Sequence, residues 1–344
     1  MRAIGKRLWM ATLAAVLALA AAGCGSPASN GAGQGDANSG EPIVIKFSHV
    51  TTPDSPKGQA AEKFKELAEQ KTNGRVKVEV FPSGQLYGDK EELEALQAGN
   101  VQMIAPSVTK LVGLNPAFQI VDMPFLFNSR EAVLKFWDGE LGQKLMKSLE
   151  PHGILGLAMW ENGFKQFTNS KRPLKRPEDF KGLKFRTQAG KVLEAQFKAL
   201  GAGAATIPFN ETYVALQQGT VDGQENTFNN IDTQRYAEVQ KYLTVSNHGR
   251  LDYVVLVNKS FWEGLPEDIR KALEEALKEA TEFERQLAYE LDQKSFENLK
   301  KAGMEVYELT EEDKEAFRKA LEPVYAEFAD VIGKEFIDGA RALK

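Results

Sequence analysis

The sequence contains a single cysteine, Cys24, and three histidines in 344 residues. One cysteine excludes an internal disulfide and a thiolate metal cluster. The histidines, His49, His152 and His248, lie far apart, and none has a second histidine four residues on, so the helical pair of a zinc enzyme is missing. We therefore expect no metal and no cofactor.

Signatures of other functional classes are also missing. No GxSxG elbow for a serine nucleophile occurs, and the glycines of GAGAA, which begins at Gly201, follow a predicted helix and precede a predicted strand, the reverse of a dinucleotide-binding loop. The formal net charge is −5, and no basic tract stands out beyond the N-terminal segment. These features argue against an enzyme and against nucleic acid as a partner.

The N-terminal segment reads as an export signal. Positive residues precede an apolar run over 8–22, which is short for a membrane span, and small residues then lead to Cys24. This ending resembles a bacterial lipobox, which implies a signal over 1–24 and a lipid anchor on Cys24. An ordinary secretory signal with an incidental cysteine is the alternative. The small, polar stretch 25–40 predicts a flexible tether, so the protein is expected in the periplasm or on the outer face of the cytoplasmic membrane.

The remaining chain of about 300 residues is long enough for two domains. Strand and helix patterns alternate from Ile43 onward, which predicts mostly parallel α/β sheets covered by helices. Expected strands cover 43–48, 76–81, 101–105, 154–160, 183–186, a stretch ending at 209–210, 242–245, 253–257 and 304–309. Expected helices cover 56–71, 89–98, 130–149 and 310–343, with a buried irregular segment or a short strand over 118–127.

The longest expected helix runs from Pro266 to about Lys301, with apolar residues spaced by threes and fours. At 1.5 Å per residue it is about 50 Å long, more than one small domain is wide, so we expect it to span both lobes. We place lobe I at 41–161 plus 252–290 and lobe II at 162–251 plus 291–344.

Polar and aromatic residues recur where the predicted strands end, and ligands bind at that edge of α/β sheets. These residues are His49, Ser107, Trp160, Lys165, Arg186, Phe209 and Asn210. Arg186 is the strongest candidate because a guanidinium can bond both oxygens of a carboxylate at once. Its alternative is a surface ion pair with Asp179 or Glu194, while Trp160, Phe209 and His49 have alternatives as core residues.

Five motifs together resemble the solute-binding subunits of tripartite ATP-independent periplasmic (TRAP) transporters, the DctP family. They are FSHVTTPDSPKGQAA, WENGFKQFT, KRPLKRPEDFKGLKFR, PFNETYVALQQGTVDGQEN and VNKSFWEGLPEDIR. The likeness covers nearly all of the chain beyond the tether. It implies a periplasmic-binding-protein-like α/β fold, with two lobes that close by a hinge over a small carboxylate and then engage membrane permease subunits.

The resemblance also implies roles for individual residues. The carboxylate-binding arginine falls on Arg186, the ligand-orienting asparagine on Asn226 and the aromatic wall on Phe209. The NGFK form places Lys165 where many members have a second arginine, and it resembles the branch that binds four-carbon dicarboxylates such as malate, succinate or fumarate. The lysine would meet the second carboxylate. Less certain neighbours are His49, Lys57, Ser107 and Trp160.

Two other functions stay open at this point. An exported enzyme on an organic acid would use His49 or Glu225 as general base. A ligand sensor that contacts a receptor would use the same lobe closure as a transporter subunit.

Overall fold

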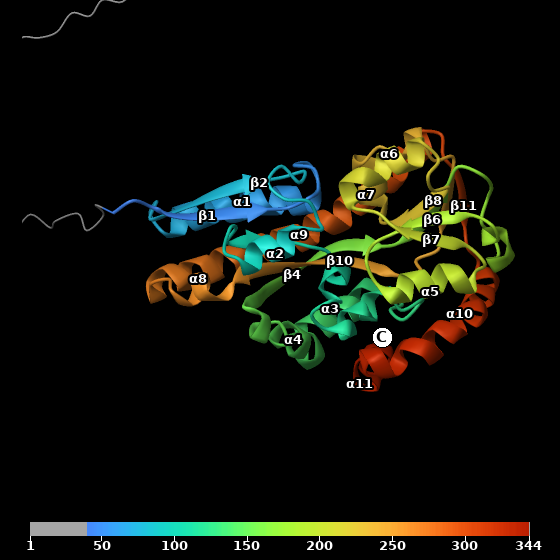
Figure 1. Cartoon of the computed structure of the whole chain (residues 1–344). Coiled ribbons are helices and arrows are strands. Elements are labelled where there is room, and N and C mark those ends of the chain that lie inside the picture. The colour runs from blue at the N-terminus through green and yellow to red at the C-terminus, as the bar shows by residue number, and fades with distance from the viewer. Residues whose placement is uncertain (1–39, 344) are drawn as a thin grey trace, which may run out of the picture. The chain divides into compact units, whose positions relative to one another are not determined.

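The computed structural model describes residues 40–343, which contain two mixed β-sheets covered by helices (Figure 1). The first sheet has the order β2-β1-β3-β10-β4 and the second β11-β9-β5-β8-β6-β7. The first sheet's strands are β1 (Ile43–Ser48), β2 (Val76–Phe81), β3 (Met103–Ile104), β4 (Ile154–Phe164) and β10 (Arg250–Asn258). The second sheet's strands are β5 (Gln166–Asn169), β6 (Lys184–Thr187), β7 (Gly203–Thr206), β8 (Gly223–Asn226), β9 (Tyr242–Val245) and β11 (Glu305–Glu308).

The first β-α-β unit forms as its sequence predicts. Ser55 caps α1 (Pro56–Lys71) by accepting a hydrogen bond from the Gly58 N–H, and a proline at the first helical position needs no partner for its nitrogen. The parallel pairing of β1 with β2 then buries Phe64 of α1 against the sheet. Further helices are α2 (Glu92–Gln97), α5 (Lys191–Ala199), α6 (Thr212–Gln217), α7 (Phe228–Thr233) and α8 (Lys259–Glu263).

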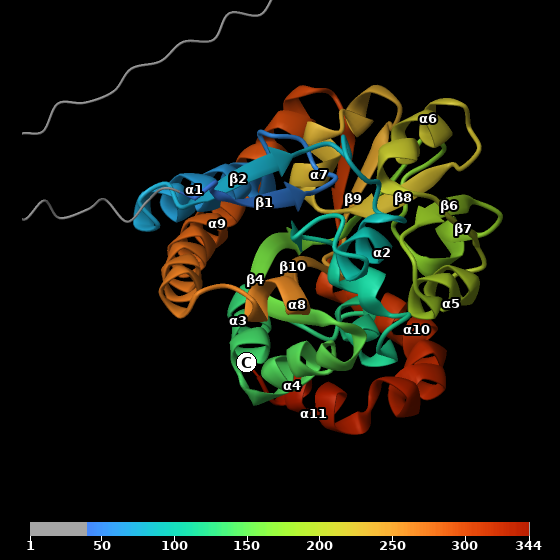
Figure 2. The ribbon, with the colours of Figure 1, turned by 60° about the vertical axis from the view of Figure 1, so that its left-hand side comes forward.

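The long helix α9 (Glu267–Lys301) packs on both sheets' layers, as its length predicts (Figures 1 and 2). Leu273 and Ala280, from its first half, lie in the core with Phe64 of α1. Phe296, from its second half, stacks on Phe228 of α7 with ring centroids 4.5 Å apart. This confirms a two-lobe α/β fold in which one helix serves both lobes.

Two expected helices are each broken at a glycine. The expectation of one helix over 130–149 is wrong, because α3 (Arg130–Asp138) and α4 (Glu140–Lys147) are separated at Gly139, where a Cβ would lie 2.7 Å from the Lys135 carbonyl oxygen. The expected C-terminal helix is likewise divided into α10 (Glu311–Ile332) and α11 (Lys334–Ala342). Gly333 between them has φ 100°, a conformation that ends a helix.

The strand expected to end at 209–210 ends earlier. β7 stops at Thr206, and Pro208 interrupts the pairing. Phe209–Glu211 then forms a 3-10 turn, η5. Other 3-10 turns are η1 (Val108–Leu111), η2 (Pro116–Asp122), η3 (Glu150–His152), η4 (Pro177–Phe180) and η6 (Tyr236–Glu238). The short strand β5, which was not expected, carries the chain from the first sheet into the second directly after Lys165.

Some expectations fall outside these observations. The predicted signal segment 1–24, including Cys24, lies outside the described residues, as does the predicted tether apart from Gly40. Across residues 40–343, no helix has both the length and the apolar character needed to cross a membrane. The lobe boundaries given above stay a prediction.

Candidate functional site

Arg186 lies on β6 with its side chain fully buried. Its Nε donates to the Ile207 carbonyl oxygen at 2.9 Å, but neither Nη1 nor Nη2 has a partner within the described part of the chain. Burial lowers the pKa of Arg186, yet a guanidinium stays protonated at neutral pH. A buried cation with unused donors is costly, so Arg186 is the candidate residue for binding an anion that accepts from both nitrogens.

A small cavity lies between the two sheets near this arginine. Its lining comes from both lobes and combines polar and apolar side chains. The lining residues are Val50, Thr51, Asp89, Glu92, Ser107, Lys110, Gln188, Phe209, Asn230, Leu251 and Tyr253. A groove of about 620 Å³ shares Asp89, Glu92 and Lys110 with the cavity. Asp89 interacts electrostatically with both Arg186 and Lys57, so these two cations flank the same region.

A chain of hydrogen bonds holds the amide side chains of the site. Asn230 Nδ2 donates to Asn226 Oδ1 at 2.8 Å, and Asn162 Nδ2 donates to the Tyr253 hydroxyl at 2.7 Å. Asn226 Oδ1 also accepts from the Thr227 N–H, so the oxygen is used while Nδ2 has no partner among residues 40–343. Asn226 is on β8, which pairs with β6 beside Arg186. Its free N–H₂ can therefore donate to an anion near Arg186.

Lys57, from the buried face of α1, supplies the second cation near the cavity. Its Nζ donates to the Ala105 carbonyl oxygen at 2.8 Å and lies 3.7 Å from the centroid of the Tyr253 ring. Burial lowers the pKa of Lys57 to about 8, while Glu92 and Asp89 act in the opposite direction. Only one of its three N–H donors has a hydrogen-bond partner in the described residues, so Lys57 can still bind an anion.

Lys165 has a different environment, with two carboxylates on its ammonium. Nζ lies 2.7 Å from Asp122 Oδ1 and 2.8 Å from Glu225 Oε1, and all three side chains are buried. Burial alone would lower the pKa of Lys165, but the two carboxylates raise it. Glu225 also bonds His248 Nε2 and Gln196 Nε2. Lys165, which lies between β4 and β5 where the chain passes from the first sheet to the second, is therefore part of an internal ion-pair cluster.

The remaining predicted residues lie near the cavity or in the core. Ser107 lines the cavity, and its Oγ has no partner in the described structure. His49 bonds the Thr51 hydroxyl through Nδ1, and burial followed by the charge of Lys57 lowers its pKa to about 3, so its ring is neutral. Trp160 packs on Phe47 in the first sheet's core and donates through Nε1 to Thr281 of α9, which fits its alternative as a core residue.

Sequence reasoning missed several residues of this site. Tyr253 lies in an apolar strand and reads as core, and Asn230 lies in a short helix with no recognisable pattern. Asn162 stood within a quoted motif, but nothing in the sequence indicated its bond to Tyr253. Only the folded chain brings these three side chains together.

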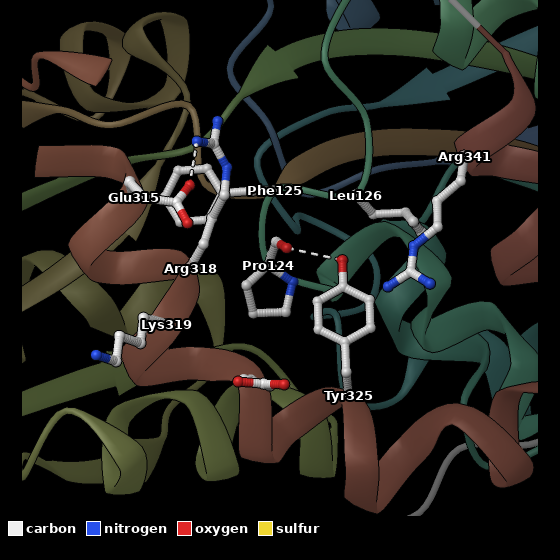
Figure 3. Close-up of a pocket in the computed structure, with 9 residues that line it drawn as sticks. Pro124, Phe125, Leu126, Glu315, Arg318, Lys319, Tyr325 and Arg341 are labelled. Carbon is white, nitrogen blue, oxygen red and sulfur yellow. Dashed lines mark hydrogen bonds and ion pairs between the residues drawn. The ribbon is translucent and has the colours of Figure 1, made fainter. Parts of the chain in front are cut away.

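A second groove of about 620 Å³ lies beside α10 and α11, and Arg186 is not among its lining residues (Figure 3). Figure 3 shows Arg318 bonded to Glu315, and the Tyr325 hydroxyl donating to the Pro124 carbonyl oxygen. Arg318 lies over the Phe125 ring and bonds Glu315, while Arg341 lies over the Tyr325 ring. In the described residues, no polar side-chain atom of this groove is both buried and unpartnered. The groove therefore has no buried donor like Arg186 that a ligand would satisfy. Nor do residues 40–343 contain a metal-binding group of three His, Cys, Asp or Glu side chains.

The fold and the site together define a two-lobed α/β protein with a buried arginine whose two Nη atoms have no partner in the described residues. The chain belongs to the bacterial extracellular solute-binding protein family 7, whose family model matches residues 47–330. It is a TRAP solute-binding protein rather than an enzyme, as the sequence motifs predicted.

Relatives of known ligand are similar over nearly the whole described chain. The C4-dicarboxylate-binding periplasmic protein of Rhodobacter capsulatus is 52% identical over 304 residues, which cover 88% of this chain and 91% of that protein. A TRAP solute-binding protein from Shewanella oneidensis with bound succinate has a TM-score of 0.86 at 44% identity, covering 88% and 99%. One from Pseudomonas aeruginosa with bound L-malate has a TM-score of 0.81 at 44% identity, covering 83% and 100%.

Proposed function

We propose that this protein captures a four-carbon dicarboxylate such as succinate, malate or fumarate and delivers it to the membrane permease subunits of a TRAP transporter. The observation that carries the proposal is the buried Arg186, whose two Nη atoms have no partner within the described residues. One carboxylate of the ligand accepts from both. The ligands named for the Shewanella and Pseudomonas relatives support the dicarboxylate class.

The second carboxylate binds Lys57 rather than Lys165 in this proposal. Lys165 already neutralises Asp122 and Glu225, and binding a third carboxylate there would place three negative groups around one ammonium. Lys57 has free N–H donors and no hydrogen-bonded carboxylate within residues 40–343. A dicarboxylate held by Arg186 from lobe II and Lys57 from lobe I connects the two lobes.

Four further residues complete the ligand's surroundings. Asn226 Nδ2 donates to the carboxylate on Arg186, and Phe209 forms an apolar wall. Ser107 Oγ and His49 Nε2, which are buried and have no partner in the described residues, supply further polar groups from lobe I. Charge-assisted hydrogen bonds contribute about 1.5 to 3 kcal/mol each, so two or three of them supply much of the roughly 8 kcal/mol behind a micromolar affinity. Contacts from both lobes exist together only in the closed form, which favours closure on binding.

Calorimetric titration tests the ligand class. Succinate, malate and fumarate should bind at least about tenfold more tightly than butyrate, because the monocarboxylate leaves Lys57 without its anion. Butyrate binding as tightly as succinate would contradict the dicarboxylate proposal.

Replacing Lys57 with methionine should raise the Kd for succinate by about tenfold or more and leave the Kd for butyrate nearly unchanged. The wild-type affinity for succinate should also fall as the pH rises through about 8, since the ammonium of Lys57 loses its proton there. Lys57→Met should lack most of this pH dependence. Calorimetry from pH 6.5 to 9.5 in one buffer series measures both effects, and an identical pH profile in the variant would rule out Lys57 as the titrating group.

The export prediction belongs to the same proposal. We infer a mature chain that begins at Cys24 and is held by lipid at the outer face of the cytoplasmic membrane, so that the binding lobes reach the permease. Mass spectrometry of the mature N-terminus tests it. A mature chain without lipid on Cys24 would contradict the anchor while leaving the ligand proposal intact.

A further inference from the structure

The residue after the aromatic wall makes a hydrogen bond across the groove. Asn210 is exposed and follows Phe209 in η5, and its Nδ2 donates to the Ser83 carbonyl oxygen at 3.0 Å. Ser83 follows β2 of the first sheet, whereas η5 follows β7 of the second. Asn210 lines the groove that shares residues with the ligand cavity, but it does not line the cavity itself. The bond therefore joins the two lobes without a side chain that faces the ligand.

The turn at Ser83 and Gly84, which accepts the Asn210 hydrogen bond, lets the Asn210 side chain come close to its backbone. Ser83 and Gly84 both have left-handed backbone conformations, with φ of 56° and 69°. A Cβ added to Gly84 would overlap Asn210 Nδ2, so a glycine is needed for this bond to form. The Ser83 and Gly84 N–H groups donate to the carbonyl oxygens of Thr51 and His49 at 2.9 and 3.0 Å. The turn is thus fixed to the segment that lines the lobe I side of the cavity.

A second contact holds the same 3-10 turn to lobe I. The Phe209 N–H donates to Asp89 Oδ2 at 3.2 Å, and Lys110 Nζ lies 2.8 Å from the same oxygen. Consecutive residues, Phe209 and Asn210, therefore both bond the opposite lobe. Because Phe209 also lines the cavity, ligand contact and lobe contact are made by one short rigid element.

We propose that Asn210 and the Ser83–Gly84 turn form a latch that sets how long the ligand stays bound. The inference rests on the proposed function for the ligand and goes beyond it, since neither latch residue touches the ligand. The latch bond exists only when the lobes meet, so losing it speeds opening and release while the encounter of ligand with the open form is unchanged. Asn210 is thus a positioning residue for closure.

Release of radiolabelled succinate into excess unlabelled succinate measures the latch directly. Asn210→Ala should release succinate about two- to tenfold faster, as expected for one hydrogen bond, with the association rate unchanged. Gly84→Ala should release it at least as fast, because its methyl group displaces the Asn210 side chain. Combining both changes should add little beyond the faster single variant, because both remove the same bond.

Glu211→Ala is the matched control, since Glu211 is exposed on the same turn and makes no hydrogen bond or ion pair across the groove within residues 40–343. It should release succinate at the wild-type rate. Wild-type release rates in Asn210→Ala and Gly84→Ala, at unchanged thermal unfolding midpoints, would overturn the latch. Failure of the wild type to bind any dicarboxylate would instead overturn the proposed function.

A measurement that needs no ligand tests the latch even if the wild type binds no dicarboxylate. Spin labels on cysteines replacing the exposed Lys77 and Lys198, one in each lobe, with Cys24→Ser to remove the natural thiol, report the distance distribution between lobes. Asn210→Ala should shift the population towards longer distances than in the wild type. Identical distributions would overturn the latch.

Discussion

Arg186→Met should raise the Kd for succinate at least about a hundredfold, while the thermal unfolding midpoint of the empty protein stays unchanged or rises. The guanidinium offers two unused N–H donor groups to a carboxylate, and each charge-assisted bond contributes about 1.5 to 3 kcal/mol. Without ligand, the same buried charge has only the Ile207 carbonyl as hydrogen-bond partner among residues 40–343. Methionine fills similar space and removes a buried cation whose two Nη atoms have no hydrogen-bond partner in the described residues, so we expect no loss of stability.

Two measurements on one preparation test whether Arg186→Met loses affinity for succinate while keeping its stability. Calorimetry gives the Kd, and a thermal unfolding series gives the midpoint with and without succinate. Arg186→Lys serves as the conservative control: it keeps a charge but loses the paired donor geometry, so it should bind succinate with an affinity between those of wild type and Arg186→Met. If Arg186→Met binds succinate normally, or if its empty form unfolds far below the wild type, Arg186 is a structural residue.

Lys165→Met, unlike Arg186→Met, should destabilise the empty protein, lowering its free energy of unfolding by about 3 to 5 kcal/mol. The change leaves Asp122 and Glu225 buried together without the cation between them. Burial already raises the pKa of Asp122 to about 6 even with Lys165 present, which shows how weakly this site solvates a carboxylate. Glu225 keeps His248 and Gln196 as hydrogen-bond partners, whereas Asp122 keeps only the Thr109 hydroxyl as a side-chain partner within residues 40–343.

Urea unfolding of Lys165→Met measures this loss. Lys191→Met is the matched control, because the ammonium of Lys191 pairs with Glu194 at 2.8 Å on an exposed helix face, where such pairs contribute little. Its stability should stay within about 0.5 kcal/mol of the wild type. If Lys165→Met is as stable as the wild type but fails to bind dicarboxylates, Lys165 contacts the dicarboxylate directly.

The local parts of the fold were predictable because their causes are local. Ser55 and Pro56 start α1 through capping, and the spacing of apolar residues over 266–301 predicts one long helix. Arg186 could be predicted as a candidate anion-binding residue because it ends an apolar strand and a guanidinium can bond both oxygens of a carboxylate. The breaks at Gly139 and Gly333 were missed because glycine is tolerated inside helices and only the tertiary packing decides where the chain turns.

The environment of each lysine was not predictable, since it depends on contacts between distant segments. Lys165 meets Asp122 and Glu225, which lie 43 and 60 residues away in the sequence. Lys57 reads as a solvated helix residue in a polar segment, yet it is buried against Tyr253 from a strand nearly two hundred residues later. The resemblance to the TRAP family named both lysines as candidates, and the folded chain distinguishes the one with free donors from the one already paired.

A crystal structure of the protein with succinate tests the central claim most directly. The account predicts one carboxylate on Arg186 Nη1 and Nη2, the other within hydrogen-bond distance of Lys57 Nζ, and Lys165 still paired with Asp122 and Glu225. Succinate bound with its second carboxylate on Lys165, with Asp122 or Glu225 displaced, would contradict it.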